Sequence, residues 1–191
     1  DREIELQEGV TLLPAVCNPT SDAIIHTSKS ETDLGIAAIF LRKTSSQIKV
    51  QASDPKSLAI KTWNSSWNCI LLSAIYNCEV GFNIQCDTKA ELFSENTETH
   101  ITNYFLRGLV KDNYLITEDD AKWLEKYFKV ACKLIDQENF MNAVHSMSSY
   151  RWHSMPRAQL AIIWSGIESL FDVETEITFR LSLYIAKILG K

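Results

Sequence analysis

The sequence predicts an α+β fold, in which a mixed N-terminal region with a few strands packs on a C-terminal antiparallel helical bundle. Two observations lead to this prediction. Residues 1–116 mix short strand-like runs with one clear helical pattern, whereas residues 117–191 carry consecutive helical patterns joined by short turns. The chain has 191 residues, enough for one large domain or two small ones. We therefore predict a domain boundary between residues 116 and 117.

Three segments of the N-terminal region are predicted as strands or parts of a hairpin. Residues 34–41 (LGIAAIFL) form a continuous apolar run of strand length. Residues 47–52 (QIKVQA) and 79–86 (EVGFNIQC) alternate between apolar and polar side chains, as a half-buried strand does. Residues 101–109 (ITNYFLRGL) fit either a strand or a helix.

One helix is predicted to start at residues 54–55. The Asp54 carboxylate can accept hydrogen bonds from the first free amides of a helix, and Pro55 suits the first helical position. Trp63 and Trp67 follow one turn apart. Tryptophan pairs at this spacing are typical of core anchors, so we expect both rings to be buried.

The C-terminal region predicts consecutive antiparallel helices. Thr117 is followed by three acidic residues, a cap whose charges complement the first turn of a helix. Another helical pattern covers residues 138–150, and Pro156 restarts the chain as a further helix. The last pattern covers residues 176–190. In the helix from Pro156, the side chains expected to face inward are Leu160, Ile163, Trp164, Ile167, Leu170 and Phe171.

Composition limits the function classes. The net charge is −5, with the acidic excess in residues 1–117, so a stand-alone DNA-binding module with a basic stripe is not expected. The chain has no apolar run long enough to cross a membrane and no basic-then-apolar leader, so we expect a cytoplasmic protein that does not bind membranes. Because the chain begins at Asp1 rather than Met, we expect it to be part of a longer protein.

The cysteines and histidines do not predict a metal or cofactor site. The chain has 5 Cys and no C-x-x-C pair, which is typical of reduced cytosolic thiols. The 4 His have no familiar metal spacing. The sequence also lacks the G-x-S-x-G nucleophile motif, Gly-rich phosphate loops and H-E-x-x-H. We predict no metal and no cofactor.

Glu168 is the candidate that the helical pattern singles out. It lies one turn after Trp164, at the edge of the apolar face of its predicted helix. Arg157 lies on the same side but about 16 Å away along the axis, so Arg180 on the next helix is the better partner. Two interpretations stay open. Glu168 forms an interhelical ion pair with Arg180, or it orients a cationic side chain toward a substrate phosphate.

A second basic group lies in the connector before Pro156. The run "RWH" brings Arg151 and His153 together at a helix junction. Such a pair can bind an anion, and it can equally cap the helices around it. The sequence leaves both alternatives open.

The C-terminal part resembles a known family. The segments "FMNAVHSMSSYRW" and "PRAQLAIIWSGIESLFDVETEITFRLSLYIAKILG" are similar to the ApeA-like branch of the HEPN domains. The upstream segments "WNCILLSAIYN" and "TEDDAKWLEKYF" look like the region that accompanies these domains. The resemblance implies a small helical bundle that acts on RNA in a stress or phage-defence setting. Many HEPN domains are dimeric ribonucleases that need no metal.

The resemblance also implies a role for Glu168. The family signature is an Arg followed after four to six residues by a His, where the His acts as acid or base and the Arg holds the scissile phosphate. An acidic residue on an earlier helix supports that Arg, and Glu168 matches this position. No Arg of this chain is followed by a His at that spacing. The chain ends about where the helix with this pair would begin, so we expect a bundle truncated at its C-terminal end.

The predicted function is therefore that of a HEPN-like domain in an RNA-cleaving or RNA-binding protein, dimeric through the bundle, with the catalytic Arg–His helix outside this chain. Glu168 is the supporting catalytic residue, and Arg180, Arg157, Arg151 and His153 are the candidate substrate-binding residues. A non-catalytic helical module that binds a partner or nucleotide and mediates dimerisation is the main alternative. A conventional hydrolase with an unrecognised site is the third.

Overall fold

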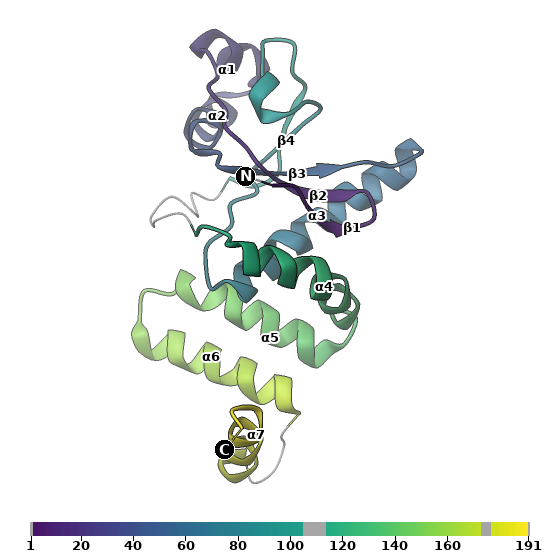
Figure 1. Cartoon of the computed structure of the whole chain (residues 1–191). Coiled ribbons are helices and arrows are strands. Elements are labelled where there is room, and N and C mark those ends of the chain that lie inside the picture. The colour runs from purple at the N-terminus through teal and green to yellow at the C-terminus, as the bar shows by residue number, and fades with distance from the viewer. Residues whose placement is uncertain (1, 105–113, 173–176, 191) are drawn as a thin grey trace. The chain divides into compact units, whose positions relative to one another are not determined.

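The structure, a computed structural model, describes residues 2–104, 114–172 and 177–190 (Figure 1). Within these residues it shows an α+β fold with seven α-helices and two small antiparallel sheets, so the predicted fold class is confirmed. The contacts divide the chain into two units. The first comprises Asp1–Cys69 and Val80–Lys129, and the second comprises Ile70–Glu79 and Val130–Lys191. The domain boundary at residues 116/117 stays a prediction.

The larger sheet belongs to the first unit and has three strands. β1 (Ile4–Gln7), β2 (Val10–Pro14) and β3 (Ser46–Val50) lie in the order β1-β2-β3, and both neighbouring pairs are antiparallel. Alternate residues of β1 and β2, such as Leu6 and Leu12, are buried, because successive side chains of a strand point to opposite faces. The strand predicted at residues 47–52 is thus confirmed for residues 47–50, which lie in β3, while β1 and β2 had not been predicted.

The strand predicted at residues 34–41 is wrong. These residues lie in α2 (Glu31–Lys43), which follows α1 (Ser21–Thr27). The side chain of Ser30 accepts a hydrogen bond from the Asp33 N–H at 3.1 Å and so starts α2. The buried residues Ile36, Ala37 and Leu41 have helical rather than alternate spacing. Ala37 and Leu41 pack in a cluster with Cys17 and Ile24.

The smaller sheet pairs β4 (Ile84–Cys86) with β5 (Thr99–Ile101) in antiparallel register. The strand predicted at residues 79–86 is therefore confirmed only for its last three residues. Of the segment 101–109, Ile101 ends β5, and residues 105–109 lie outside the described part of the chain. A short 3-10 turn at Ala90–Leu92 lies between the two strands in sequence.

The first long helix is α3 (Pro55–Ile75), and its predicted start is confirmed. The Asp54 carboxylate accepts hydrogen bonds from the Ser57 N–H at 2.9 Å and from the Ser57 hydroxyl at 2.6 Å. These contacts lower the pKa of Asp54, because they stabilise its charged form. The expected burial of Trp63 is wrong, since this side chain is 76% exposed, whereas Trp67 is half-buried.

The helix α4 (Glu118–Leu134) begins as predicted after Thr117. The Thr117 hydroxyl accepts from the Asp120 N–H at 3.2 Å, and the Asp120 carboxylate accepts from the Thr117 N–H at 2.8 Å. Leu124 and Phe128 are fully buried in the first unit. Ion pairs connect the N-terminal strand with this helix, since Arg2 pairs with Glu118 at 2.6 Å and Lys129 pairs with Glu5 at 3.2 Å.

Three helices of the second unit follow in sequence. They are α5 (Glu138–Ser149), α6 (Pro156–Phe171) and α7 (Ile177–Ile188), with a 3-10 turn at Tyr150–Trp152 after α5. Figure 1 shows α5 and α6 side by side and antiparallel, as predicted. The rings of Phe171 and Tyr184 stack with their centroids 5.7 Å apart and so connect α6 with α7.

The predicted inward face of α6 is partly wrong. Gly166 is the buried residue of this helix, and it lies against Ser146 of α5. By contrast, the exposed fractions are 66% for Leu160, 43% for Trp164 and 49% for Leu170. The apolar residues of α6 extend around most of the helix, and the small residue determines which side approaches α5.

Candidate functional site

The candidate residues of the second unit lie in two groups at opposite ends of α6. Arg151, His153 and Arg157 belong to the 3-10 turn, the connector and the first turn of α6. Glu168 lies near the C-terminal end of α6, and Arg180 lies on α7. Because Arg157 precedes Glu168 by eleven residues, about 16 Å of helix separates them. The structure therefore does not gather the predicted residues into one site.

Glu168 lies one turn after Trp164 in the C-terminal half of α6. Its side chain is half-buried. Among the described residues, none forms an ion pair or a hydrogen bond with its carboxylate, so the interhelical ion pair with Arg180 is not formed. A carboxylate that is partly removed from water without a partner is unfavourable. The Glu168 carboxylate can therefore still accept a hydrogen bond from a cationic group.

Arg180 is an exposed residue of α7. It has an interaction partner of its own in the structure, but this partner is not Glu168. Arg180 and Glu168 belong to neighbouring helices of the same unit, because α6 and α7 contact each other.

Arg151 is held within the fold. One of its guanidinium nitrogens donates a hydrogen bond to the side-chain oxygen of Asn77 at 2.6 Å, and the Tyr150 hydroxyl donates to the same oxygen at 2.8 Å. Asn77 has a φ of 47°, the left-handed region that asparagine tolerates better than most residues. The guanidinium also lies 5.3 Å from the centre of the Tyr150 ring. Arg151 thus joins the end of α3 to the turn before α6.

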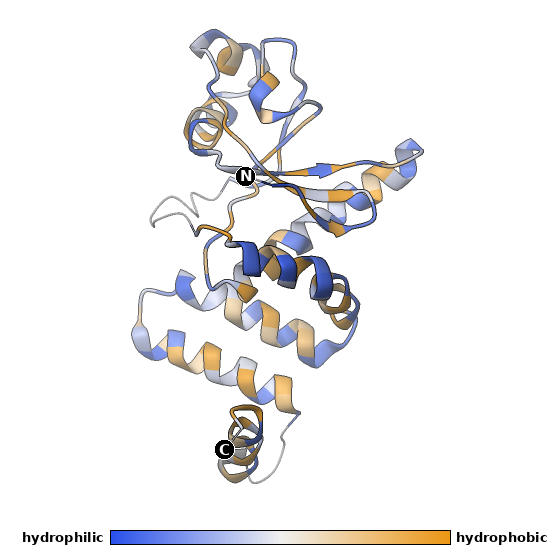
Figure 2. Ribbon diagram, viewed as in Figure 1, coloured by the Kyte–Doolittle hydropathy of each residue, from blue (hydrophilic) through white to orange (hydrophobic). Residues whose placement is uncertain are grey.

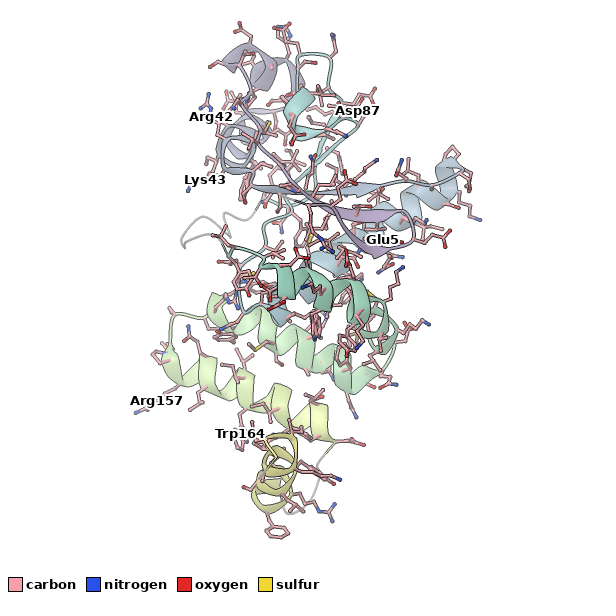
Figure 3. All side chains as sticks on the ribbon, in the orientation of Figure 1. Glu5, Arg42, Lys43, Asp87, Arg157 and Trp164 are labelled. Atoms are coloured by element: carbon pink, nitrogen blue, oxygen red, sulfur yellow. The ribbon has the colours of Figure 1, made fainter. Side chains whose placement is uncertain are left out.

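His153 and Arg157 are exposed at the start of α6. The backbone carbonyl of His153 accepts a hydrogen bond from the Gln159 side chain at 2.6 Å, which positions the connector. Figure 3 shows the Arg157 side chain extending from the first turn of α6 away from the helices. Of the first group, His153 and Arg157 therefore have side chains that an anion from solution can reach, whereas Arg151 is already bonded.

Apolar side chains are exposed on both α6 and α7. Figure 2 shows hydrophobic residues along each of these helices, and Figure 3 shows Trp164 on the side of α6 toward α7. On α7, the exposed fractions are 68% for Phe179, 56% for Leu183 and 71% for Ile188. Leu160 and Trp164 are one turn apart on α6, and Phe179 and Leu183 are one turn apart on α7, so we call these four exposed residues the α6–α7 apolar surface. Concentrations of exposed apolar side chains of this kind are typical of protein interfaces.

The described residues contain no group of three or more His, Cys, Asp or Glu that could hold a metal ion. The five thiols are free, and burial raises the pKa of Cys69 to about 12, which keeps this thiol protonated and unreactive. No described helix has the length and apolar character that a membrane crossing requires.

Sequence reasoning did not identify two features. One is Asn77, whose role depends on a backbone conformation that the sequence does not reveal. The other is a cavity of about 250 Å³ in the first unit, where Asp33 and Tyr104 form a hydrogen bond. Asp33 lies in a segment predicted to border a strand, so its place in the first turn of α2 could not be recognised.

Comparisons with known protein families, with characterised proteins and with solved structures find nothing that matches this chain. The geometry of the chain and its own sequence therefore carry the functional argument.

Proposed function

We propose that this chain is a HEPN-like module of an RNA-cleaving or RNA-binding protein, and that it forms a homodimer through the α6–α7 apolar surface. The observation that carries the proposal is the half-buried Glu168 carboxylate, which has no partner among the described residues. Such a carboxylate is suited to orienting a cationic side chain that binds a phosphate. The catalytic Arg–His pair is absent from these 191 residues. We therefore expect this chain to bind RNA without cleaving it.

Dimerisation is supported by the exposure of the α6–α7 apolar surface. Side chains such as Phe179 and Leu183 are mostly in contact with water, which is unfavourable in a monomer and favourable once a second copy covers them. A second copy could also provide the cation that Glu168 lacks. The free thiols support a cytoplasmic location.

RNA binding is tested by titrating fluorescently labelled single-stranded RNA with the chain, in EDTA, and comparing it with Glu168→Gln. If Glu168 orients a phosphate-binding cation, the variant binds RNA about tenfold more weakly, because it loses a charge-assisted contact. If Glu168 is only a nearby negative charge, its removal strengthens binding to the anionic RNA. The two roles thus change the affinity in opposite directions.

Asp136→Asn is the matched control, because Asp136 is an exposed acid in the turn between α4 and α5. It removes the same charge from the second unit without touching the candidate site. Equal effects of the two variants, or no RNA binding by the folded wild-type chain, would refute the role of Glu168.

The dimer is tested by sedimentation of the wild-type chain and of Phe179→Lys. A charge on the α6–α7 apolar surface is expected to shift the population to monomer, whereas Trp63→Lys, at an exposed aromatic side chain of the first unit, leaves it unchanged. A wild-type chain that is purely monomeric at high micromolar concentration contradicts the dimer.

The alternative proposal is a non-catalytic helical module whose role is dimerisation or partner binding. The missing Arg–His pair and the α6–α7 apolar surface favour it. A chain that dimerises but binds no RNA would support this alternative over RNA binding.

A further inference from the structure

A cavity of about 250 Å³ lies in the first unit, and none of the residues that the proposed function uses belongs to its lining. One side is formed by Thr27, Lys29 and Asp33, at the end of α1 and the start of α2. The other side is formed by residues 99–101 and Tyr104. These two sides come from segments about seventy residues apart in sequence, so the cavity is a product of the fold rather than of one loop.

The buried charged group in the lining is the Asp33 carboxylate. Asp33 is 8% exposed, and the Tyr104 hydroxyl donates a hydrogen bond to its Oδ1 at 2.9 Å. The N-terminus of α2 favours the negative charge at this position. No other described group donates to the carboxylate, and no fully enclosed side-chain oxygen is left without a bond in the described part of the chain. The Oδ2 atom is therefore accessible from the cavity and free to accept a hydrogen bond.

The hydroxyl groups of two threonines in the lining already donate hydrogen bonds to backbone carbonyls, so they are not donors for a ligand. The Thr27 hydroxyl donates to the Ala23 carbonyl at 2.8 Å, and the Thr99 hydroxyl donates to the Thr27 carbonyl at 2.7 Å. The second bond ties β5 to the end of α1. The shape of the cavity is thus maintained by hydrogen bonds that involve the backbone.

Lys29 and His100 add a cation and an imidazole to the lining, in contrast to the Asp33 anion. Both side chains are exposed, both line the cavity, and neither forms an ion pair or a side-chain hydrogen bond with a described residue. The cavity therefore combines a buried anion with an exposed cation and an imidazole. A ligand that is only anionic would meet the Asp33 charge, and one that is only cationic would meet Lys29.

We propose that this cavity binds a small zwitterion of the α-amino acid type. Its ammonium group donates to Asp33 Oδ2, and its carboxylate faces Lys29 and His100, so each charge of the ligand meets its complement. The volume is below the usual range of sites for drug-sized molecules, roughly 300–1,000 Å³, which suits a ligand of a few heavy atoms. This site is independent of the proposed RNA role.

Calorimetric titration of the chain with each of the twenty common amino acids tests the proposal. At least one is expected to bind. Its N-acetyl derivative, which has no ammonium group, is expected to bind at least about tenfold more weakly, as is its primary amide, because each loses a charged hydrogen bond. If none of the twenty binds at millimolar concentration, or if the N-acetyl derivative binds equally well, the proposal is overturned.

Variants assign the contacts. Asp33→Asn is expected to weaken binding at least about tenfold, since it removes the charge that the ammonium group meets. Lys29→Gln is expected to weaken it to a lesser degree, because Lys29 is exposed. Lys56→Gln, at an exposed lysine of α3, is the control and leaves the affinity unchanged.

Tyr104→Phe keeps the ring and frees Oδ1, so it reports on the cavity even if Asp33→Asn fails to fold. We expect it to retain binding, because Oδ2 is the proposed acceptor. Unchanged affinity in a folded Asp33→Asn, or complete loss in a folded Tyr104→Phe, contradicts the assignment.

Discussion

Gly166 of α6 lies so close to Ser146 of α5 that a Cβ atom at position 166 would stand 2.6 Å from the Ser146 Cβ. Real Cβ atoms do not approach a carbon so closely, so the absence of a side chain at this position allows the two helices to pack at their observed separation. The contact determines which side of α6 faces α5. It also accounts for the apolar residues that remain exposed on the other side of α6.

Gly166→Ala is therefore expected to destabilise the protein. Overpacking a well-packed contact costs about 1–3 kcal/mol, and the better helix propensity of alanine offsets about 1 kcal/mol of this. We expect a net fall of up to about 2 kcal/mol in the free energy of unfolding, measured by urea denaturation. In the Ser146→Gly background the clash disappears, so there the same substitution should become stabilising.

Gly35→Ala is the matched control. Gly35 also lies inside a helix, but a Cβ there would meet nothing within 4 Å. Only the helix propensity changes, so we expect the free energy of unfolding to rise by about 1 kcal/mol. A loss of stability at both glycines would show that the contact with Ser146 is not the cause.

Phe128 and Tyr127 are neighbours on α4 with opposite environments. Phe128 is fully buried, whereas Tyr127 is 41% exposed and lies 5.5 Å from the Trp123 ring. Phe128→Ala is expected to lower the free energy of unfolding by about 3–5 kcal/mol, because it leaves a cavity in the core. Tyr127→Ala should cost about 1 kcal/mol, the scale of a lost aromatic pair. Both variants are compared with the wild type by chemical denaturation. Equal losses of stability would contradict the orientation of α4, in which Phe128 is buried and Tyr127 is exposed.

Asn77 combines a positive φ with two accepted hydrogen bonds. Asn77→Gly loses the bonds from Tyr150 and Arg151 but keeps the backbone conformation available. Asn77→Ala loses both the bonds and the conformation, and the left-handed region costs an alanine about 1–2 kcal/mol. We expect the alanine variant to melt at the lower temperature. If the order is reversed, the φ of Asn77 does not contribute to stability.

The buried thiol of Cys69 makes stability fall at high pH. Burial raises its pKa from 9.0 to about 12, so the folded state holds the proton more tightly than the unfolded state. The stabilisation is complete below pH 9 and is lost as the pH rises from 9 to about 12. Within this window, each pH unit should cost the wild type about 1.4 kcal/mol more than Cys69→Ala. Urea denaturation of both proteins at pH 8 and pH 10.5 gives the comparison, and parallel losses would contradict it.

The parts of the fold that could be predicted depend on local signals. Asp54 with Pro55, and Thr117 with Asp120, start helices through contacts within three residues, and both starts were predictable. The run at residues 34–41 was not, because a short apolar run suits a strand and a buried helix equally. Ser30 was the signal that would have decided it, since its side chain caps α2.

The candidate site was predictable only as a set of residues. Helical spacing places Glu168 beside Trp164, and the structure keeps it there. Spacing cannot show that Arg151 is held by Asn77, a residue 74 positions earlier in the sequence. The cavity at Asp33 depends equally on distant segments, because Tyr104 lies 71 positions away. Such contacts are set by the packing of the whole unit.

The ion pairs of the N-terminal strand constrain the order in which this protein can be assembled during translation. The ion pair of Arg2 can form only after Glu118, 116 positions later, has been synthesised, and the ion pair of Glu5 only after Lys129 has been. β1 is thus synthesised long before its charged neighbours on α4. Slowing synthesis just before residue 118 would prolong the exposure of β1 and make aggregation of the nascent chain more severe.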